Sequence, residues 1–344
     1  MHMKRKLLSL ASLVLSVVLL CGCSANAQEL LPLGSPRLAV LGGTGNGEYP
    51  TVSVQEILDA AQAVGLDAFT AEGGAAQLAT LATEQKATVF AVCLANSSDA
   101  PAYVSAAAAL GLPVIFCGEK PDASALQPYS KCWYVGASPA KQGELLGEAL
   151  FADYQAGRIP DKSGDKLLQV VIFTGGAAED SRAAATLRIF ENRGVFNDTL
   201  AIVPVSGTSA EEQQAAITAT LLQQTGAELI LASTPTLATA AAEAVAKVLP
   251  GVPVGTFGDD DTLSSYLNSG AVLATVYYQN SKAAGLVATF AQNAALGRDP
   301  TVGTGARLDE NHCTLVDFTT KTAPASQATP LPEQTDNAIA TGDE

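Results

Sequence analysis

The sequence has little of what histidine-based catalysis or nucleic-acid recognition requires. Its 344 residues include 2 histidines and 1 tryptophan, and 19 basic side chains stand against 34 acidic ones, a formal net charge of −15. No arrangement of Ser or Cys with His and Asp surrounds His312, and His2 falls within the segment expected to be removed. Nucleic acid and anionic lipid surfaces both attract basic patches. The sequence therefore predicts neither an enzyme nor a nucleic-acid-binding protein.

The N-terminal apolar run is too short to remain as a transmembrane helix. It extends from Leu7 to Leu20, about 14 residues, whereas a bilayer crossing needs about 20. Basic residues precede it, and small Gly22 follows shortly before Cys23, which is the order of a secretory signal peptide. Leu20 and Gly22 also resemble a bacterial lipobox, whose cysteine is diacylated. Residues 1–22 are expected to be a lipoprotein signal peptide, and Cys23 the lipidation site that holds an exported protein to the membrane.

The sequence contains 6 cysteines, and Cys21 competes with Cys23 for the lipid. Cys21 would place bulky Leu20 directly before the cleavage point, where a small residue is expected, so Cys23 is preferred. The other cysteines fit no zinc pattern such as paired CxxC. Each lies in or beside an apolar run and is expected to be a small buried core residue, although export leaves disulfides open. These residues are Cys93, Cys117, Cys132 and Cys313.

Between a tether at residues 23–36 and a tail at 322–344, short β-branched runs alternate with longer Ala- and Leu-rich stretches. The tail lacks apolar periodicity and is expected to be disordered. The expected strands are 37–41, 68–71, 88–94, 113–117, 132–136, 167–174, 201–204, 228–232, 252–257 and 272–277. The expected helices are 52–64, 75–84, 100–110, 139–154, 180–193, 210–224, 237–248 and 281–294.

This order predicts an α/β fold with two lobes. Strict alternation of strand and helix is typical of doubly wound parallel sheets, and continuously apolar strands such as 170–173 suit burial on both faces. About ten strands are too many for one compact open sheet. A polar break at 157–165 divides them into two groups. In such sheets ligands bind beyond the carboxyl ends of the strands, so the residues that follow each strand are the candidate site.

The segment 134–143, preceded by 113–116 and 119–121, resembles the type I periplasmic sugar-binding proteins, and within them the galactose/glucose-binding proteins. The resemblance continues through 161–169, 182–194, 228–232 and 268–276 and covers roughly residues 37 to 320. It implies two Rossmann-like lobes joined by a hinge of three crossovers, near Cys117, Tyr278 and Arg307, without catalysis. The N-terminal lobe would comprise 37–116 plus 279–306, and the C-terminal lobe 117–278 plus 307–321.

The segment 161–169 has the spacing of a calcium loop. Hard cations take oxygen donors from alternate positions of a tight loop. The resemblance implies that a distant Glu just before a strand completes the site. Lys166 departs from the family, which has Gly there for a positive φ, and the alternative is a solvated polar loop. The expected ligands of a structural Ca²⁺ are Asp161, Ser163, Asp165, the Leu167 carbonyl, Gln169 and Glu228.

The resemblance extends to only some of the residues of the family's sugar site. Arg182 matches the family's ligand Arg, and Asp259 or Asp260 matches its ligand Asp. The family's ligand His-x-Asp is missing, and its stacking Trp position falls near Ser206, so the pocket is diverged. For Arg182 the alternative is an exposed residue paired with an acidic neighbour on its helix. The further candidate contacts are Asn46, Glu48, Tyr49, Cys93, Asn96, Thr234 and Tyr278.

These observations predict a membrane-anchored solute-binding protein of an ABC importer. It would capture a small polar, sugar-like ligand by closure of its lobes. Its partners would be that ligand, an ABC permease and the membrane through the lipid alone, and the chain would act as a monomer. A ligand-sensing lipoprotein that presents its ligand to a chemoreceptor or histidine kinase is the alternative. The Gly-rich stretch 42–47 does not have GxGxxG spacing, so no organic cofactor is expected.

Overall fold

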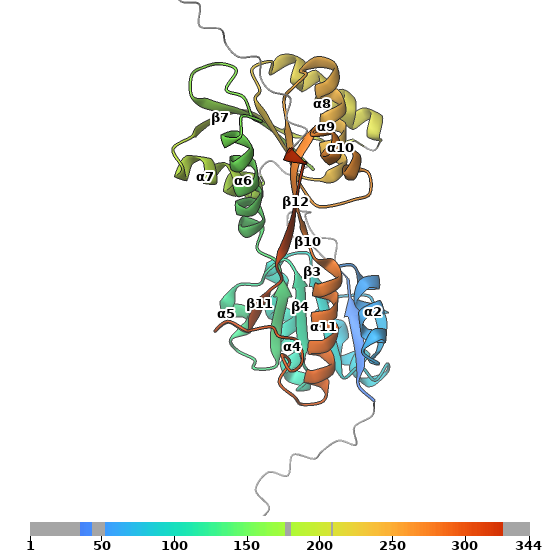
Figure 1. Cartoon of the computed structure of the whole chain (residues 1–344). Helices are drawn as coiled ribbons and strands as arrows, with labels where there is room; N and C mark the ends of the chain where they lie inside the picture. The colour runs from blue at the N-terminus through green and yellow to red at the C-terminus, as the bar shows by residue number, and fades with distance from the viewer. Residues whose placement is uncertain (1–34, 43–51, 176–179, 208, 326–344) are drawn as a thin grey trace, which may run out of the picture.

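The computed structural model describes residues 35–42, 52–175, 180–207 and 209–325. They form two α/β lobes joined by a narrow waist, each built on a six-stranded sheet (Figure 1). The strand order is β11-β5-β4-β3-β1-β2 in the first sheet and β12-β10-β9-β8-β6-β7 in the second. The expected fold of two Rossmann-like lobes with parallel sheets is confirmed, apart from one antiparallel edge strand described below.

The N-terminal lobe has parallel pairing throughout its sheet. One face packs against two helices and the other against three, because its central strands are apolar on both sides. The strands are β1 (Arg37–Leu41), β2 (Asp67–Ala71), β3 (Val89–Leu94), β4 (Val114–Gly118), β5 (Cys132–Gly136) and β11 (Cys313–Leu315). The helices are α2 (Val54–Ala63) and α11 (Asn280–Ala295) on one face and α3 (Leu78–Thr83), α4 (Ala100–Leu110) and α5 (Ala123–Leu126) on the other, with short 3₁₀ turns η1 (Ala75–Gln77) and η2 (Ser97–Asp99).

The C-terminal lobe repeats this layout, except that its last strand pairs antiparallel with β10. Its strands are β6 (Leu167–Thr174), β7 (Phe196–Pro204), β8 (Leu229–Ala232), β9 (Val254–Phe257), β10 (Val272–Tyr278) and β12 (Phe318–Thr322). The helices α6 (Pro139–Gln155) and α7 (Ser181–Asn192) cover one face, and α8 (Ala210–Gln223), α9 (Pro235–Val248) and α10 (Leu263–Ser269) cover the other.

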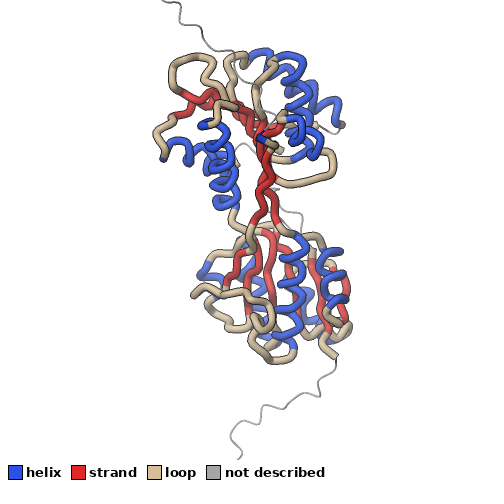
Figure 2. The backbone as a smooth tube through the Cα atoms, in the orientation of Figure 1, coloured by secondary structure: helices blue, strands red, loops and turns tan. Residues whose placement is uncertain are grey.

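The chain crosses between the lobes from β5 to α6, from β10 to α11 and from β11 to β12 (Figure 2). The crossover expected at Tyr278 is confirmed, whereas those expected near Cys117 and Arg307 are wrong. Strand β5 pairs in parallel with β4, so the chain stays in the N-terminal lobe through Gly136, and β11 pairs with β5. The N-terminal lobe is therefore 37–136 plus 280–315, not 37–116 plus 279–306. The C-terminal lobe is 139–278 plus 318–322, not 117–278 plus 307–321.

The C-terminal tail was predicted to begin at Thr322, which is too early in the chain. Thr322 pairs with Ala274 in the sheet, and Ala323 is buried against β6 and β10 residues. The signal-like segment, Cys23 and residues 326–344 lie outside the described residues. Within the described residues, no helix combines the length and hydropathy that a membrane crossing requires.

The four cysteines of the described residues are buried free thiols, as expected of core residues. Cys93 and Cys117 lie directly opposite each other on β3 and β4, with their Sγ atoms 2.8 Å apart. Burial raises the pKa of Cys132 to about 12 and that of Cys313 to about 11. These thiols are therefore packed in the core of the N-terminal lobe and are not exposed nucleophiles.

Candidate ligand-binding site

A cavity of about 290 Å³ opens at the carboxyl ends of the C-terminal-lobe strands and reaches the start of α11 in the other lobe. Parallel strands direct their carboxyl ends to one edge of a sheet, where α/β proteins bind ligands. Residues that follow β8, β9 and β10 form most of its wall. The lining residues are Gln142, Arg182, Ser233, Thr234, Pro235, Phe257, Gly258, Asp259, Tyr277, Tyr278 and Asn280.

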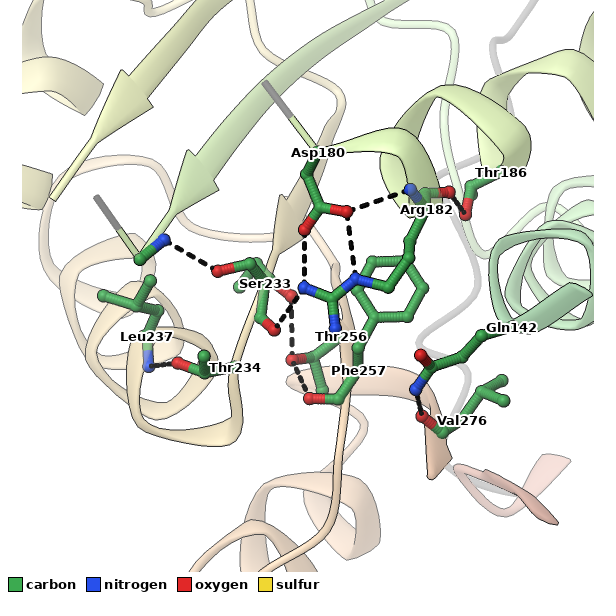
Figure 3. Close-up of polar contacts among 12 residues, drawn as sticks. Gln142, Asp180, Arg182, Thr186, Ser233, Thr234, Leu237, Thr256, Phe257 and Val276 are labelled. Carbon is green, nitrogen blue, oxygen red and sulfur yellow. Dashed lines mark hydrogen bonds and ion pairs between the residues drawn. The ribbon is translucent and has the colours of Figure 1, made fainter. Parts of the chain in front are cut away.

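Arg182, at the first turn of α7, is the most tightly held of the expected contacts (Figure 3). It is buried, and its guanidinium forms a two-point ion pair with Asp180, through Nε to Oδ1 at 2.9 Å and Nη2 to Oδ2 at 2.6 Å. Nη2 also donates to the carbonyl of Ser233, and the guanidinium lies 4.6 Å from the centre of the Phe257 ring. The alternative of an exposed Arg182 is wrong, although its pairing with Asp180 is present.

The position of Arg182 follows from close helix packing. Gly143 and Gly147 of α6 face α7, and a Cβ on Gly143 would lie 2.2 Å from the Arg182 carbonyl oxygen. Asp180 begins α7 by accepting a hydrogen bond from the Arg182 N–H. Asp180 thus holds both the backbone and the guanidinium of Arg182. Among the described residues no acceptor is assigned to Nη1 of Arg182. This nitrogen of the guanidinium is therefore the donor left for a ligand.

The two acidic candidate residues, Asp259 and Asp260, have different contacts in the structure. Asp259 lines the cavity and pairs with Lys321 of β12, whose ammonium lies 4.9 Å from the centre of the Tyr277 ring. The hydrogen bond to Asp259 is the largest cause that raises the pKa of Lys321 above its usual value. Asp260 instead accepts hydrogen bonds from Thr262 and from the N–H of Leu263 at the start of α10. Asp259 is therefore the candidate contact, and Asp260 is a turn residue.

Two polar atoms of the cavity wall are buried without a partner: Oε1 of Gln142 and the hydroxyl of Tyr278. Burial raises the pKa of Tyr278 far above its usual value, so its hydroxyl stays protonated. A buried polar group without a hydrogen bond costs about 1–3 kcal/mol. Thr234 also lines the cavity and caps α9 by accepting from the Leu237 N–H. The two unpaired atoms, on Gln142 and Tyr278, have hydrogen-bonding capacity that the protein itself does not use.

The expected contacts of the N-terminal lobe are not brought to this cavity. Cys93 lies in the core against Cys117 and the Val52 carbonyl, because β3 is buried on both faces. Asn96 is exposed and caps η2 through the Ser98 N–H. Neither residue lines the cavity. Asn46, Glu48 and Tyr49 lie outside the described residues.

Several lining residues were not expected. Ser233 and Gly258 follow β8 and β9 directly, so the rule that ligands bind beyond the strand ends could have found them. Phe257 ends β9, where its apolar character indicated only core. Gln142 lies in the first turn of α6, and its place in the wall depends on how α6 crosses to β10. No local pattern carries that information.

The candidate calcium loop gathers oxygen donors at the amino end of β6. The Ser163 hydroxyl lies 3.1 Å from Oδ1 of Asp161 and 3.4 Å from Oε1 of Gln169. Lys166 has a φ of 66°, in the left-handed region that glycine favours. The turn that the family makes with glycine is therefore made here by lysine. Donor types and loop conformation fit a hard cation.

The carboxylates of this loop are engaged by protein donors. Fully buried Glu228 accepts from the backbone N–H groups of Lys162, Ser163 and Gln169. The Ser163 side chain is the largest cause that holds the pKa of Asp165 below its usual value. In the part of the chain that the structure describes, no three acidic, His or Cys side chains form a group that would hold a metal ion. A cation would have to draw Glu228 and Asp165 away from these hydrogen bonds.

The protein has two α/β lobes, three crossovers between them and a polar cavity at the strand ends. This is the architecture of a type I periplasmic binding protein. Residues 40–299 match the model of the periplasmic binding protein domain family, and the chain belongs to this family. Its sugar-binding members are non-catalytic components of transport, so the chain is not an enzyme, and membership implies an exported protein.

The relatives are distant. A D-galactose/methyl-galactoside binding periplasmic protein of Haemophilus influenzae is 25% identical over 115 residues, which span 33% of this chain and 35% of the relative. A periplasmic solute-binding protein of Actinobacillus succinogenes with bound D-allose has a TM-score of 0.63 at 18% identity, over 85% of this chain and 99% of that one. A solute-binding protein of Bacillus halodurans with bound myo-inositol has a TM-score of 0.61 at 14% identity, over 85% and 96%. At these identities the solved structures establish the fold.

Proposed function

We propose that the chain is a solute-binding lipoprotein of an ABC importer that captures a small neutral polyhydroxylated ligand by closing its lobes. The observation that carries this proposal is the set of charges in the cavity wall. Arg182 is neutralised by Asp180, and Asp259 by Lys321, so each charged group already has a partner within the protein. The bound solutes of the two structural relatives, D-allose and myo-inositol, are of the same neutral class.

The wall therefore favours hydroxyl groups over a charged ligand. An anion at Arg182 would compete with Asp180, whose side chain is almost completely buried beside it. Removing a buried charge from its partner is costly, because the group left behind is desolvated. A hydroxyl can instead accept from Nη1 of Arg182 and donate to Asp259 without disturbing either ion pair. Tyr277 adds an aromatic ring to the same wall.

Isothermal titration with sugars and polyols, against sulfate and carboxylates as the charged set, tests the ligand class. We expect saturable binding of a neutral compound and none of the anions. Arg182→Lys keeps the charge but loses the planar fork, so affinity should fall about tenfold or more. Arg193→Lys is the matched control, since Arg193 lies at the other end of α7, over the Phe151 ring, and pairs with Glu148 away from the cavity. Tight binding of an anion alone would refute the neutral class.

The lipid anchor at Cys23 is part of the same proposal. It rests on the signal-like order of basic, apolar and small residues that ends at Cys23. Two acyl chains would hold the protein stably at the membrane surface, beside its permease. Cell fractionation tests it: Cys23→Ala should move the protein from the membrane fraction to the soluble one. A Cys23→Ala protein that stays in the membrane fraction would contradict the anchor.

We also propose that the 161–169 loop takes a structural Ca²⁺ through the six residues named for it. Lys166 in the left-handed region and the convergence of Ser163, Asp161 and Gln169 support this. Terbium luminescence on chelated protein is the test. Asp165→Asn keeps a carbonyl oxygen for the Leu167 N–H but loses a charge, so it should weaken binding. Absence of saturable terbium binding below millimolar concentration would contradict the proposed calcium site.

A further inference from the structure

Gln142 links two of the three crossovers at the cavity wall. It lies four residues after the first crossover residue, Ser138, and its Nε2 donates to the carbonyl of Val276, two residues before β10 ends at Tyr278 (Figure 3). The side chain is 2% exposed. The carboxamide therefore contacts both chain segments that lead into the hinge.

The bond to Val276 fixes which way the carboxamide faces. A flipped amide would set Oε1 against the Val276 carbonyl, two acceptors in contact, so the observed orientation is the stable one. Gln142 lines the cavity, and its Oε1, the carboxamide atom not bonded to Val276, is buried with no hydrogen-bond partner. Only one other cavity-wall atom of the described residues shares this state, the Tyr278 hydroxyl. A ligand in the cavity has two buried polar atoms to satisfy.

The Val276 carbonyl does not depend on Gln142. It also accepts a hydrogen bond of 2.9 Å from the Gly258 N–H. Replacing the carboxamide with an apolar side chain would therefore leave no backbone acceptor unpaired, and it would remove a buried orphan oxygen. The structural contact of Gln142 uses only its Nε2 donor, so it does not explain the buried, unpaired Oε1.

We propose that Gln142 is a specificity-determining residue whose Oε1 accepts a hydrogen bond from one hydroxyl group of the bound ligand. This inference rests on the proposed function and deepens it. It requires a donor at one position of the ligand, because an amide oxygen cannot donate. An ether, a fluorine or a hydrogen at that position cannot replace the hydroxyl.

Gln142→Met tests the role, since Met has a similar length and neither donates nor accepts strongly. D-allose, D-galactose, D-ribose and myo-inositol are titrated into the native protein, and the tightest binder is carried forward with its monodeoxy and deoxyfluoro analogues. We expect Gln142→Met to weaken the parent compound about tenfold, while the thermal midpoint of the free protein is unchanged or higher. At one position of the ligand, the deoxy and deoxyfluoro analogues should bind native protein weakly but bind Gln142→Met as tightly as the parent compound does. The substitution and the analogue remove the same hydrogen bond, so the second change has no further effect.

Thr186→Val is the control. Thr186 is also fully buried and bridges α6 and α7 through the Gly143 and Arg182 carbonyls, but it does not line the cavity. It should lower the thermal midpoint and leave the affinity ratio of parent to analogues unchanged. Equal affinity of native protein and Gln142→Met, or an equal loss for every analogue, would overturn the role of Gln142. Absence of binding to native protein by all four compounds would overturn the proposed function, and the role with it.

Discussion

The ion pairs at the cavity differ in burial, and this difference decides what each contributes. Arg182 and Asp180 are almost fully buried, whereas the Lys321 side chain of the second pair is 42% exposed. Breaking a buried pair leaves an uncompensated charge in a low-dielectric site. An exposed pair is screened by water and contributes little.

Asp180→Asn should therefore lower the free energy of unfolding by about 3 kcal/mol, because Arg182 stays buried without its counter-charge. Asn keeps the oxygen that caps the Arg182 N–H, so the loss reports mainly on charge. Lys321→Ala, the control, should cost at most about 1 kcal/mol. Urea denaturation of both variants measures these values. Equal losses would show that Arg182 has another counter-charge.

The buried cysteines predict low reactivity in the folded protein. With a pKa of about 12, a thiol such as Cys132 is thiolate in about one molecule in ten thousand at pH 8. Since the thiolate is the nucleophile, a raised pKa slows alkylation, and Cys313 with a pKa of about 11 follows the same direction. Intact mass after iodoacetamide treatment should show no labelling of Cys93, Cys117, Cys132 or Cys313 until the protein is denatured. Four labels on denatured, unreduced protein would confirm free thiols, and fewer would indicate a disulfide.

Individual site residues were predictable only where a resemblance or a strand end marked them. Arg182, Thr234, Asp259 and Tyr278 line the cavity as expected. Cys93 does not line this cavity, because β3 places its side chain in the core of the N-terminal lobe. Gln142 was missed because its role depends on α6 meeting β10, a contact between segments far apart in the chain.

Among the elements, α6 and α7 form the closest helix pair near the cavity. Glycines at 143 and 147 let the α6 backbone approach α7, and both would clash if given a Cβ. Small residues at a contact allow this approach but tolerate little added volume. The packing of α6 on α7 is thus what sets Arg182 in the cavity wall.

Gly143→Ala should destabilise the protein by about 1–3 kcal/mol, because the new methyl group meets the Arg182 carbonyl and the Ala185 side chain. The same change at Gly285 of α11 meets no atom within 4 Å and should stabilise by up to about 1 kcal/mol through helix propensity. Thermal unfolding of the two variants gives opposite shifts. A destabilising Gly285→Ala or a neutral Gly143→Ala would contradict this packing argument.

Most strands and helices followed from apolar periodicity, since buried parallel strands are continuously apolar. The missed strands and α-helices are β11, β12, α5 and α10. Strand β12, Phe-Thr-Thr-Lys-Thr, pairs only with β10 at the edge of its sheet, so its outer side is polar. Strand β11 has three residues. Such elements are fixed by their neighbours, and their own sequence carries little signal.

At the scale of the whole molecule, the two-lobe plan was predictable but its boundaries were not. Composition showed a polar break at 157–165, yet the chain leaves the N-terminal lobe at Gly136. Crossover positions depend on which strands pair, and pairing between β4, β5 and β11 is non-local. The waist carries specific contacts: Tyr278 packs on Phe318 with ring centres 5.7 Å apart, and Gln279 donates to the Thr319 hydroxyl.

These contacts join the second and third crossovers into one unit, so the lobes should move as rigid bodies about it. The cavity wall comes mainly from one lobe and reaches Asn280 of the other, so a ligand there gains contacts when the lobes approach. Small-angle X-ray scattering should show a smaller radius of gyration with saturating ligand than without it. Intrinsic fluorescence is a weaker probe, because Trp133 is buried in β5.

At a ligand concentration only a few times the dissociation constant of the native protein, Arg182→Lys should stay close to the radius of the free protein, since about tenfold weaker binding leaves most cavities unfilled. Raising the ligand above the new dissociation constant should restore the smaller radius, because the substitution changes affinity and leaves the hinge intact. A radius that stays constant on ligand saturation of native protein would contradict closure. It would mean that the ligand is held by the C-terminal lobe alone, and the permease would then have to recognise the ligand-bound lobe instead of a closed pair.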